Sequence, residues 1–304
     1  MSAQRIGYLC VTMAALCWAA SGAAAKDILE GGISPSALVQ VRVTLASLLL
    51  GGYFGLFRRD LLTIRVGDVW LMAAIGVLMA SVQFTYFFTI SQMNVMAAVL
   101  LQYLAPFFVA MYAICCWGER FALYKIVSLV LAFAGCYLVV GGYNIELVQM
   151  HFWGIIGGLS AAVCYAAYAL VGEKVMHRYR PWTAAFYALL VSAVVWNVIY
   201  PPLDFLTAPY DGRQWAHIVF VVLVGTIAPF GLYFVGVNYI RSTRAMITAS
   251  LEPLASGVAA YLYLGEKATL PQALGALLVI IAIALLQLYQ EKDPLAPAVI
   301  RQTK

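Results

Sequence analysis

Apolar residues follow one another along this chain in long stretches, each closed by a short polar segment. Every stretch is about 20 residues long, the length that an α-helix needs to cross a hydrocarbon core of about 30 Å. They contain no apolar/polar alternation of the kind found in barrel strands, so we expect helices that satisfy their own backbone hydrogen bonds. The pattern predicts an all-α integral membrane protein with ten transmembrane helices, at about residues 6–28, 35–57, 69–90, 95–117, 122–141, 153–175, 182–200, 215–239, 245–264 and 270–290.

The chain also repeats itself at a constant offset. The stretch "APFFVAMYAICCWGER" (105–120) returns loosely as "EPLASGVAAYLYLGEK" (252–267), which is 147 residues further on. The same shift, without a gap, brings Pro106 onto Pro253. Each repeat therefore contains five spans, at 1–147 and 148–292, followed by a tail at 293–304. Because five is an odd number, the second repeat should cross the membrane in the opposite sense, as two inverted-topology five-helix repeats around a central cavity.

The first 25 residues imitate a cleavable secretory signal, since a basic residue and an apolar stretch precede three alanines. The repeat argues against cleavage. "AALCWAA" (14–20) falls on "AAVCYAA" (161–167), so the first span has a counterpart in the second repeat. We therefore expect the first span to be kept as part of the fold.

Basic residues are distributed unevenly between the two sides of the predicted bundle. With the N-terminus inside, the inner segments hold 14 Lys and Arg, including Arg241 and Arg244, and the outer loops hold 3. Cytoplasmic loops are the ones enriched in Lys and Arg, so we expect both termini to be cytoplasmic. We expect the protein itself to lie in the cell inner (plasma) membrane. The net charge of +5 then reflects topology, and we expect no nucleic-acid partner.

Several segments together resemble the EamA-type proteins of the drug/metabolite transporter superfamily. "AALCWAASGAAAK" (14–26) resembles the first helix of that family and "ALVQVRVTLASLLL" (37–50) the second. "LLQYLAPFFVAMYAICCWGER" (100–120) and "SLEPLASGVAAYLYLGEK" (250–267) resemble the fourth and ninth helices, each with a proline and a Gly-Glu-basic ending. The resemblance implies ten helices, a cavity between the halves and transport of small metabolites. It does not identify the substrate.

Two charged residues stand out inside the spans. Glu252 is the single acidic residue that the pattern places deep in a span, where an ionisable group is costly unless it is paired, hydrated or protonated. It is either a site for protons or a substrate amine, or a structural residue bonded to a neighbouring helix. Arg42 lies about 10 Å below the outer surface. It either recognises a substrate carboxylate or stabilises helix carbonyls.

The other candidates are prolines, aromatic residues and amides at membrane depth. Pro106 and Pro253 each remove one helical hydrogen bond and are either hinges beside a cavity or packing kinks. The remaining side chains either line the cavity or pack as ordinary core. They are Trp18, Gln83, Tyr86, Gln102, Tyr103, Tyr165, Tyr233 and Asn238. The Gly-Glu-basic endings, 118–120 and 265–267, are expected to be helix stops, and "TLPQ" (269–272) a capping box that opens the last span.

These features favour a secondary transporter working by alternating access, with an amino acid or a related zwitterion as the small-molecule substrate. A proton-coupled exporter of organic cations is the alternative. A passive channel is less favoured, because the spans contain too few polar residues to line a continuous polar path. The six cysteines lie in apolar spans without a CxxC pair, and no HExxH, GxSxG or phosphate-loop motif is present. We therefore expect no enzyme activity, cofactor, metal or nucleotide; partners should be the substrate, the lipid bilayer and, as one candidate, protons.

Overall fold

The protein is described by a computed structural model that covers residues 3–92, 95–118, 122–143, 152–200, 210–264 and 269–289, with Ala298. Regular structure in these residues is helical. The principal helices are α1 (Ala3–Glu30), α2 (Pro35–Phe57), α3 (Val69–Gln92), α4 (Val95–Gln102), α5 (Ala105–Trp117), α6 (Leu123–Val140), α7 (Phe152–Met176), α8 (Pro181–Ile199), α9 (Gly212–Val222), α10 (Ala228–Ala249), α11 (Leu251–Leu264) and α12 (Leu270–Leu288).

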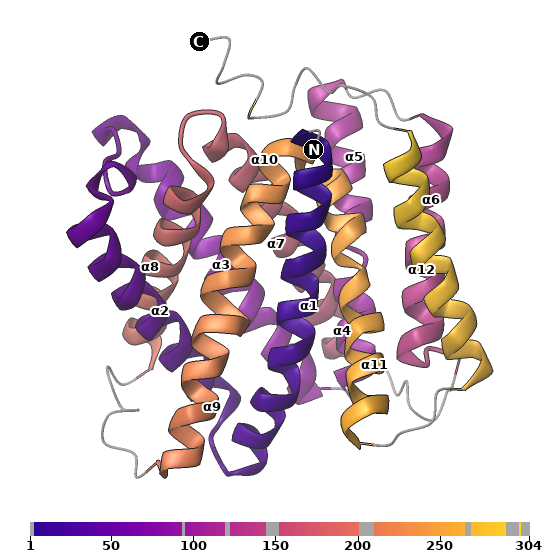
Figure 1. Cartoon of the computed structure of the whole chain (residues 1–304), viewed down its shortest axis with the longest axis horizontal. Coiled ribbons are helices and arrows are strands. Elements are labelled where there is room, and N and C mark those ends of the chain that lie inside the picture. Colours follow the sequence, from indigo (N-terminus) through magenta and orange to yellow (C-terminus); the bar gives the residue numbers. More distant parts are fainter. Residues whose placement is uncertain are drawn as a thin grey trace.

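The helices are long and apolar enough to cross a membrane. Eight helical stretches among the described residues have the length and hydropathy of a span, and a shorter apolar helix lies at Leu123–Val139. One stretch, Gly212–Ala249, has 38 residues and contains two passes. Arg241 interrupts it with φ 65° and ψ 168°. Figure 1 shows the chain rising through α9 and α10 and descending again towards α11. The predicted all-α membrane fold is confirmed.

Each half of the chain has the same order of elements. A shift of 147 residues carries α1 onto α7, α2 onto α8 and α6 onto α12. The same shift carries the break between α4 and α5, at Tyr103 and Leu104, onto the break between α10 and α11, at Ser250. Both breaks precede a proline in the first turn of the next helix, where its missing N–H has no partner to lose. The two predicted repeats are therefore present in the structure.

The two ends of the chain's helical part lie together. Tyr8 of α1 donates a hydrogen bond from its hydroxyl to the carbonyl oxygen of Leu286 in α12, at 3.0 Å. Figure 1 accordingly shows the start of α1 and the end of α12 at the same end of the bundle. We call this end the arginine-rich end, because the loops at 58–65 and 178–180 also lie there, and we call the other end the opposite end.

The first span is an integral part of the bundle. Tyr8, Val11, Ala14 and Ala15 of α1 are buried. Helix α1 packs along α10, and the glycines of both helices lie at the contact, since a Cβ on Gly7 would meet Ile240 at 2.7 Å and one on Gly236 would meet Val11 at 2.2 Å. The expectation that α1 has a place in the fold agrees with this packing.

Several expectations fall partly on residues outside the described ones. These are the Glu-basic pairs at 119–120 and 266–267 and the tail at 293–304 except Ala298. Gly118 does end α5, with φ 62° in the left-handed region. The capping box is confirmed: the Thr269 hydroxyl accepts from the Gln272 backbone N–H, and the Gln272 side chain accepts from the Thr269 N–H. The division at residue 147 stays a prediction.

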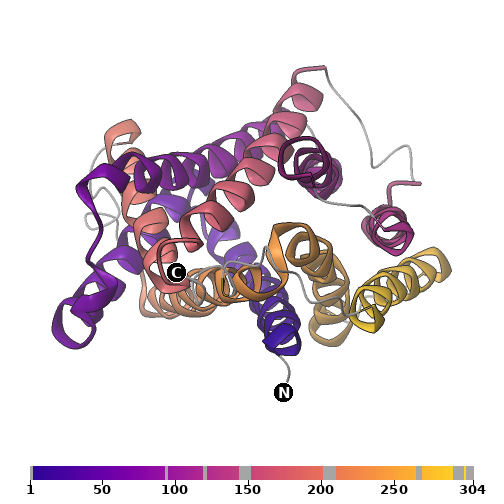
Figure 2. The same cartoon turned by 90° about the horizontal axis from the view of Figure 1, so that it is seen from above.

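Helices α6 and α12 approach each other closely, although they belong to different repeats. A Cβ on Gly275 would stand 2.7 Å from the carbonyl oxygen of Gly135, and a Cβ on Gly135 would stand 2.7 Å from the oxygen of Gly275. Small residues allow such close backbone contact between membrane helices. Figure 2 shows the two helices side by side at one edge of the bundle.

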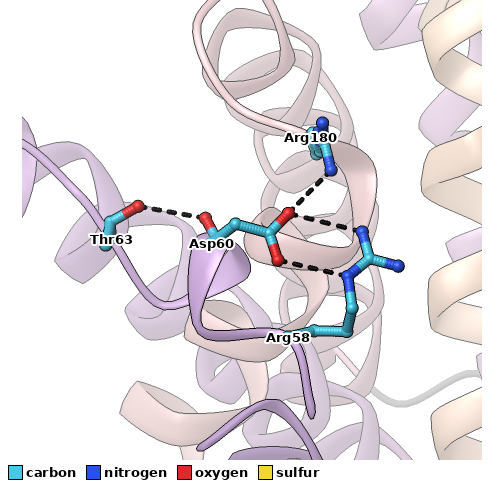
Figure 3. Close-up of polar contacts among 4 residues, drawn as sticks. All are labelled: Arg58, Asp60, Thr63 and Arg180. Carbon is cyan, nitrogen blue, oxygen red and sulfur yellow. Dashed lines mark hydrogen bonds and ion pairs between the residues drawn. The ribbon is translucent and has the colours of Figure 1, made fainter.

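At the arginine-rich end, ion pairs tie a loop of the first repeat to a loop of the second (Figure 3). Asp60 accepts from Arg58 at 3.1 and 3.3 Å, and its Oδ2 also accepts from Arg180 at 2.8 Å. Asp68 is buried beside them and accepts from Arg178 and from the Tyr179 hydroxyl. The two loops, which meet only through folding, are thereby fixed relative to each other.

We expect Gly275→Ala to destabilise the α6–α12 contact, because the added methyl group would meet backbone that cannot move aside. The cost should be about 1–3 kcal/mol, the usual range for overpacking. The matched control is Gly52→Ala, since a Cβ on Gly52 has nothing within 4 Å. Thermal unfolding in one detergent measures both, and equal unfolding midpoints for the two variants would contradict the close contact.

The Asp60 network should make a contribution to stability that depends on pH. The hydrogen bond from Arg58 holds the pKa of Asp60 below its ordinary value of 3.8, which favours the charged form in the folded protein. A lowered folded-state pKa stabilises the folded protein above the unfolded pKa, and this stabilisation is lost as the pH falls below 3.8. Asp60→Asn should therefore slightly lower the unfolding midpoint at neutral pH, and the difference from wild type should shrink in acid. A difference that is constant across this range would contradict the network.

Candidate functional site

The predicted polar residues meet where the two helix breaks face each other. The Tyr103 hydroxyl, at the α4–α5 break, donates to Glu252 Oε2 at 3.2 Å. Glu252 lies in the first turn of α11, directly after the second break. The hydrogen bond therefore joins the two repeats at the point where each has interrupted its helix.

Three more predicted residues lie within electrostatic range of Glu252. They are Arg42 of α2, Tyr86 of α3 and Tyr165 of α7. Tyr86 interacts with both Arg42 and Glu252. All of these side chains, and that of Tyr103, are half-buried. We call these five residues the central cluster: Arg42, Tyr86, Tyr103, Tyr165 and Glu252.

The charges of the central cluster are near each other but do not form a direct pair. Among the described residues, neither Arg42 nor Tyr86 forms a hydrogen bond or an ion pair with Glu252. The Arg42 Nε atom is buried and has no hydrogen-bond partner among the residues that the structure describes. Buried polar atoms are normally satisfied, so an arginine nitrogen left open marks a place where a further partner can bind.

Gln83 shows the same feature one helical turn before Tyr86 on α3. Its side chain is 6% exposed, and neither its amide nitrogen nor its amide oxygen has a hydrogen-bond partner among the described residues. Residues three apart on a helix share a face, so Gln83 points to the same side of α3 as Tyr86. It stays a candidate for polar lining of the site.

The helix breaks leave backbone groups at this depth, and the structure shows one of their partners. The carbonyl oxygen of Ser250, at the second break, is 3.6 Å from the thiol of the buried Cys136 in α6. Irregular backbone within a membrane is tolerated only when it is enclosed by protein or faces a water-filled cavity. Pro106 and Pro253 follow the two breaks, each in the first turn of the next helix, and their role as hinges stays a prediction.

The other predicted residues lie further into the packing. Trp18 is half-buried, with its ring centroid 5.4 Å from that of Phe230 and 5.9 Å from that of Tyr233. Tyr233 is 0% exposed and Asn238 is also buried, whereas Gln102 is half-buried at the end of α4. The described structure thus places Tyr233 in the apolar core, and a lining role for these residues stays a prediction.

A second buried acid, Glu173, was not predicted from the sequence. Glu252 was expected to be the single acid deep in a span, but Glu173 lies inside α7 and is 1% exposed. Its Oε1 accepts from Arg241 Nε at 2.8 Å, and its Oε2 accepts from the backbone N–H and the hydroxyl of Ser242 at 2.7 and 2.6 Å. Arg241, expected in an inner segment, is 3% exposed. A basic residue at a turn between spans, opposite an acid near a span end, was the available signal.

Aromatic residues surround this second cluster. The Arg241 guanidinium carbon lies 5.0 Å from the ring centroid of Trp117, at the end of α5. Arg244, one turn further along α10, donates to the Tyr124 hydroxyl of α6 at 3.1 Å. Tyr124 in turn stacks on Tyr289, with centroids 5.0 Å apart. Side chains from both repeats therefore meet at the arginine-rich end.

Comparison with known proteins agrees with this architecture. A protein of known crystal structure has the same fold over 94% of this chain and 96% of its own, with a TM-score of 0.75 and 16% sequence identity. An uncharacterized transporter of Archaeoglobus fulgidus is 30% identical over 66% of this chain and 69% of its own length. The uncharacterized inner membrane transporter YicL of Salmonella typhimurium is 26% identical over 95% of this chain and 97% of its own length.

A further relative has a named substrate. The threonine/homoserine exporter RhtA of Escherichia coli is 26% identical over 67% of this chain and 66% of its own length. The sequence profile of the EamA-like transporter family matches this chain twice, at residues 5–141 and 152–288, once in each repeat. Such a family transports rather than catalyses, as the absence of enzyme motifs predicted. The chain is a membrane transporter that belongs to the EamA-like transporter family.

Proposed function

We propose that this transporter exports amino acids or closely related zwitterions by alternating access, and that the substrate binds at the central cluster. The observation that carries the proposal is the pair of opposite charges, Arg42 and Glu252, held in electrostatic range without a direct contact. A zwitterion brings one charge of each sign. It can therefore supply both residues with an oppositely charged partner at once, which neither a cation nor an anion alone can do.

The chemistry of each residue fits one part of such a ligand. The planar guanidinium of Arg42 can hold a carboxylate through two parallel hydrogen bonds. The Glu252 carboxylate can accept from an ammonium group, while Tyr103 already donates to its other side. The rings of Tyr86 and Tyr165 offer apolar surface for the remainder of the substrate. The name of RhtA, an amino-acid exporter, supports the same substrate class.

The orientation of the bundle in the membrane is a further part of the proposal. Of the basic residues, 14 lie in segments that the alternation of spans assigns to the arginine-rich end and 3 at the opposite end. By the positive-inside rule, the arginine-rich end faces the cytoplasm. Relatives such as YicL are inner membrane transporters, which agrees with a site in the cytoplasmic membrane.

A second candidate is proton-coupled export of hydrophobic organic cations. The observation that favours it is the set of tyrosine rings, Tyr86, Tyr103 and Tyr165, around one carboxylate, because aromatic faces attract cations. In this case Glu252 would bind a proton and the cation in turn, and Arg42 would be structural. The two candidates differ in the part that Arg42 plays.

Counterflow in proteoliposomes tests the proposal. Vesicles loaded with unlabelled threonine should accumulate labelled threonine, and both Arg42→Gln and Glu252→Gln should reduce the initial rate at least about tenfold, equivalent to about 1.4 kcal/mol of lost interaction. Arg65→Gln is the matched control, because Arg65 is exposed in the loop after α2. The same vesicles are then tested with tetraphenylphosphonium as competitor.

The outcomes separate the candidates. Competition by neutral amino acids with loss of activity in both variants supports the zwitterion site. Competition by tetraphenylphosphonium, with Arg42→Gln still active, supports the cation exporter instead. If both variants retain wild-type counterflow, the central cluster does not bind the substrate.

A further inference from the structure

The cluster around Glu173 lies apart from the central cluster and joins three segments. Glu173 sits in the last turns of α7, and Arg241 and Ser242 form the reversal between two passes of α10. The carboxylate binds Arg241 Nε at 2.8 Å, the Ser242 backbone N–H at 2.7 Å and the Ser242 hydroxyl at 2.6 Å. Both of its oxygens are therefore occupied by donors from the reversal.

These bonds hold the backbone in an unusual conformation. Arg241 is the one non-glycine residue with positive φ among the described residues, at 65°. Side chains disfavour the left-handed region, so surrounding contacts must maintain such a residue there. Two of the three donors to Glu173 come from Ser242, the residue directly after it. The acid thus fixes the geometry at which the chain turns back into the membrane.

The reversal lies in the packed interior at the arginine-rich end of the bundle. Every side chain at positions 240–250 is buried, whereas the residues of the central cluster keep partial exposure. Trp117, from the first repeat, covers the Arg241 guanidinium at 5.0 Å. The reversal and its aromatic cover therefore form a packed layer at the arginine-rich end.

The equivalent positions of the first repeat, at the opposite end, do not carry an acid and an arginine in the sequence. Shifted by 147 residues, Glu173 falls on Lys26 and Arg241 falls on Asn94. An acid–arginine pair at the reversal is therefore not required by the fold of a repeat. Among the described residues the pair at the arginine-rich end is buried, whereas the acid–arginine pair at the opposite end, Asp27 with Arg213, is exposed.

The reversal is also connected mechanically to the central cluster. Residues 242–249 form one helical segment between the reversal and the break at Ser250, and Glu252 follows two residues later. Eight helical residues span about 12 Å, and a helix this short moves as a unit. A displacement at Arg241 would therefore be passed along this helix as far as the break at Ser250, two residues before Glu252.

From this geometry we propose that Glu173, Arg241 and Trp117 form a latch that closes the arginine-rich end of the translocation path, and that the ion pair opens whenever the central cluster is exposed to that side. The proposal rests on the alternating-access function above. In this proposal the Glu173–Arg241 pair controls the opening of one end of the path. The proposal does not depend on which zwitterion or cation is carried.

Distance measurements on the full chain in nanodiscs test the latch. The six native cysteines are replaced by serine, and spin labels are attached at Leu123→Cys and Lys174→Cys. Both positions are exposed at the arginine-rich end, on α6 of the first repeat and α7 of the second. Double electron–electron resonance then reports the open and closed populations. Glu173→Gln, which preserves the shape of the side chain, should raise the open-to-closed ratio at least about tenfold.

Two further variants keep the test decisive. Trp117→Leu removes the aromatic cover but leaves the buried charges paired, and should shift the same ratio in the same direction even if Glu173→Gln does not fold. Ser91→Ala is the control, since Ser91 is exposed at the opposite end, its hydroxyl bonds only within α3 among the described residues, and its loss should leave the labels unchanged. An unchanged distribution in folded Glu173→Gln or Trp117→Leu protein overturns the latch. Opening of the labels without amino-acid counterflow overturns the proposed substrate and leaves the latch standing.

Discussion

A peptide group that leaves a helix inside a bilayer must find its hydrogen-bond partner within the protein, because the lipid offers none. This constraint determines where the chain can be irregular. The breaks at Tyr103–Leu104 and Ser250 both occur at membrane depth, and both are enclosed by neighbouring helices, with the Ser250 carbonyl facing Cys136. Once two interrupted helices are brought together in the interior, polar side chains such as Tyr103 and Glu252 can also be placed there. The location of the candidate site thus follows from the location of the breaks.

The repeat explains the framework of the molecule, and departures from the repeat explain its chemistry. The prolines and several aromatic residues are paired: Pro106 with Pro253, Tyr86 with Tyr233 and Trp18 with Tyr165. The charged residues are not, since Arg42 corresponds to Leu189 and Glu252 to Ala105. A substrate with two different charged groups requires an asymmetric site, and a two-fold symmetric pocket could not tell one end of the substrate from the other. The buried Glu173–Arg241 pair follows the same rule at the arginine-rich end.

Hydropathy and the 147-residue offset were sufficient to predict the ten spans and the repeat, and the two prolines marked the helices in which the breaks occur, because these depend on properties that each segment carries by itself. They were not sufficient for Glu173. It lies three residues before the end of α7, where an acid is normally solvated, and Arg241 was expected in an inner segment. Their burial results from the reversal within α10, whose left-handed residue brings two helices over the acid. Such a contact between distant segments leaves no periodic trace. The same holds for Tyr233, which is at a repeated position and yet lies in the apolar core.

The close contact between Gly135 and Gly275 has a consequence for how the molecule can move. It fastens a helix of the first repeat to a helix of the second, and α1 with α10, α3 with α7 and α2 with α8 are further pairs of the same mixed kind. Neither half of the sequence is therefore free to swing as a separate block. In the alternating-access mechanism proposed above, the mobile bodies would have to be assembled from helices of both repeats, and the boundary between those bodies would run through each repeat and not along the seam between them.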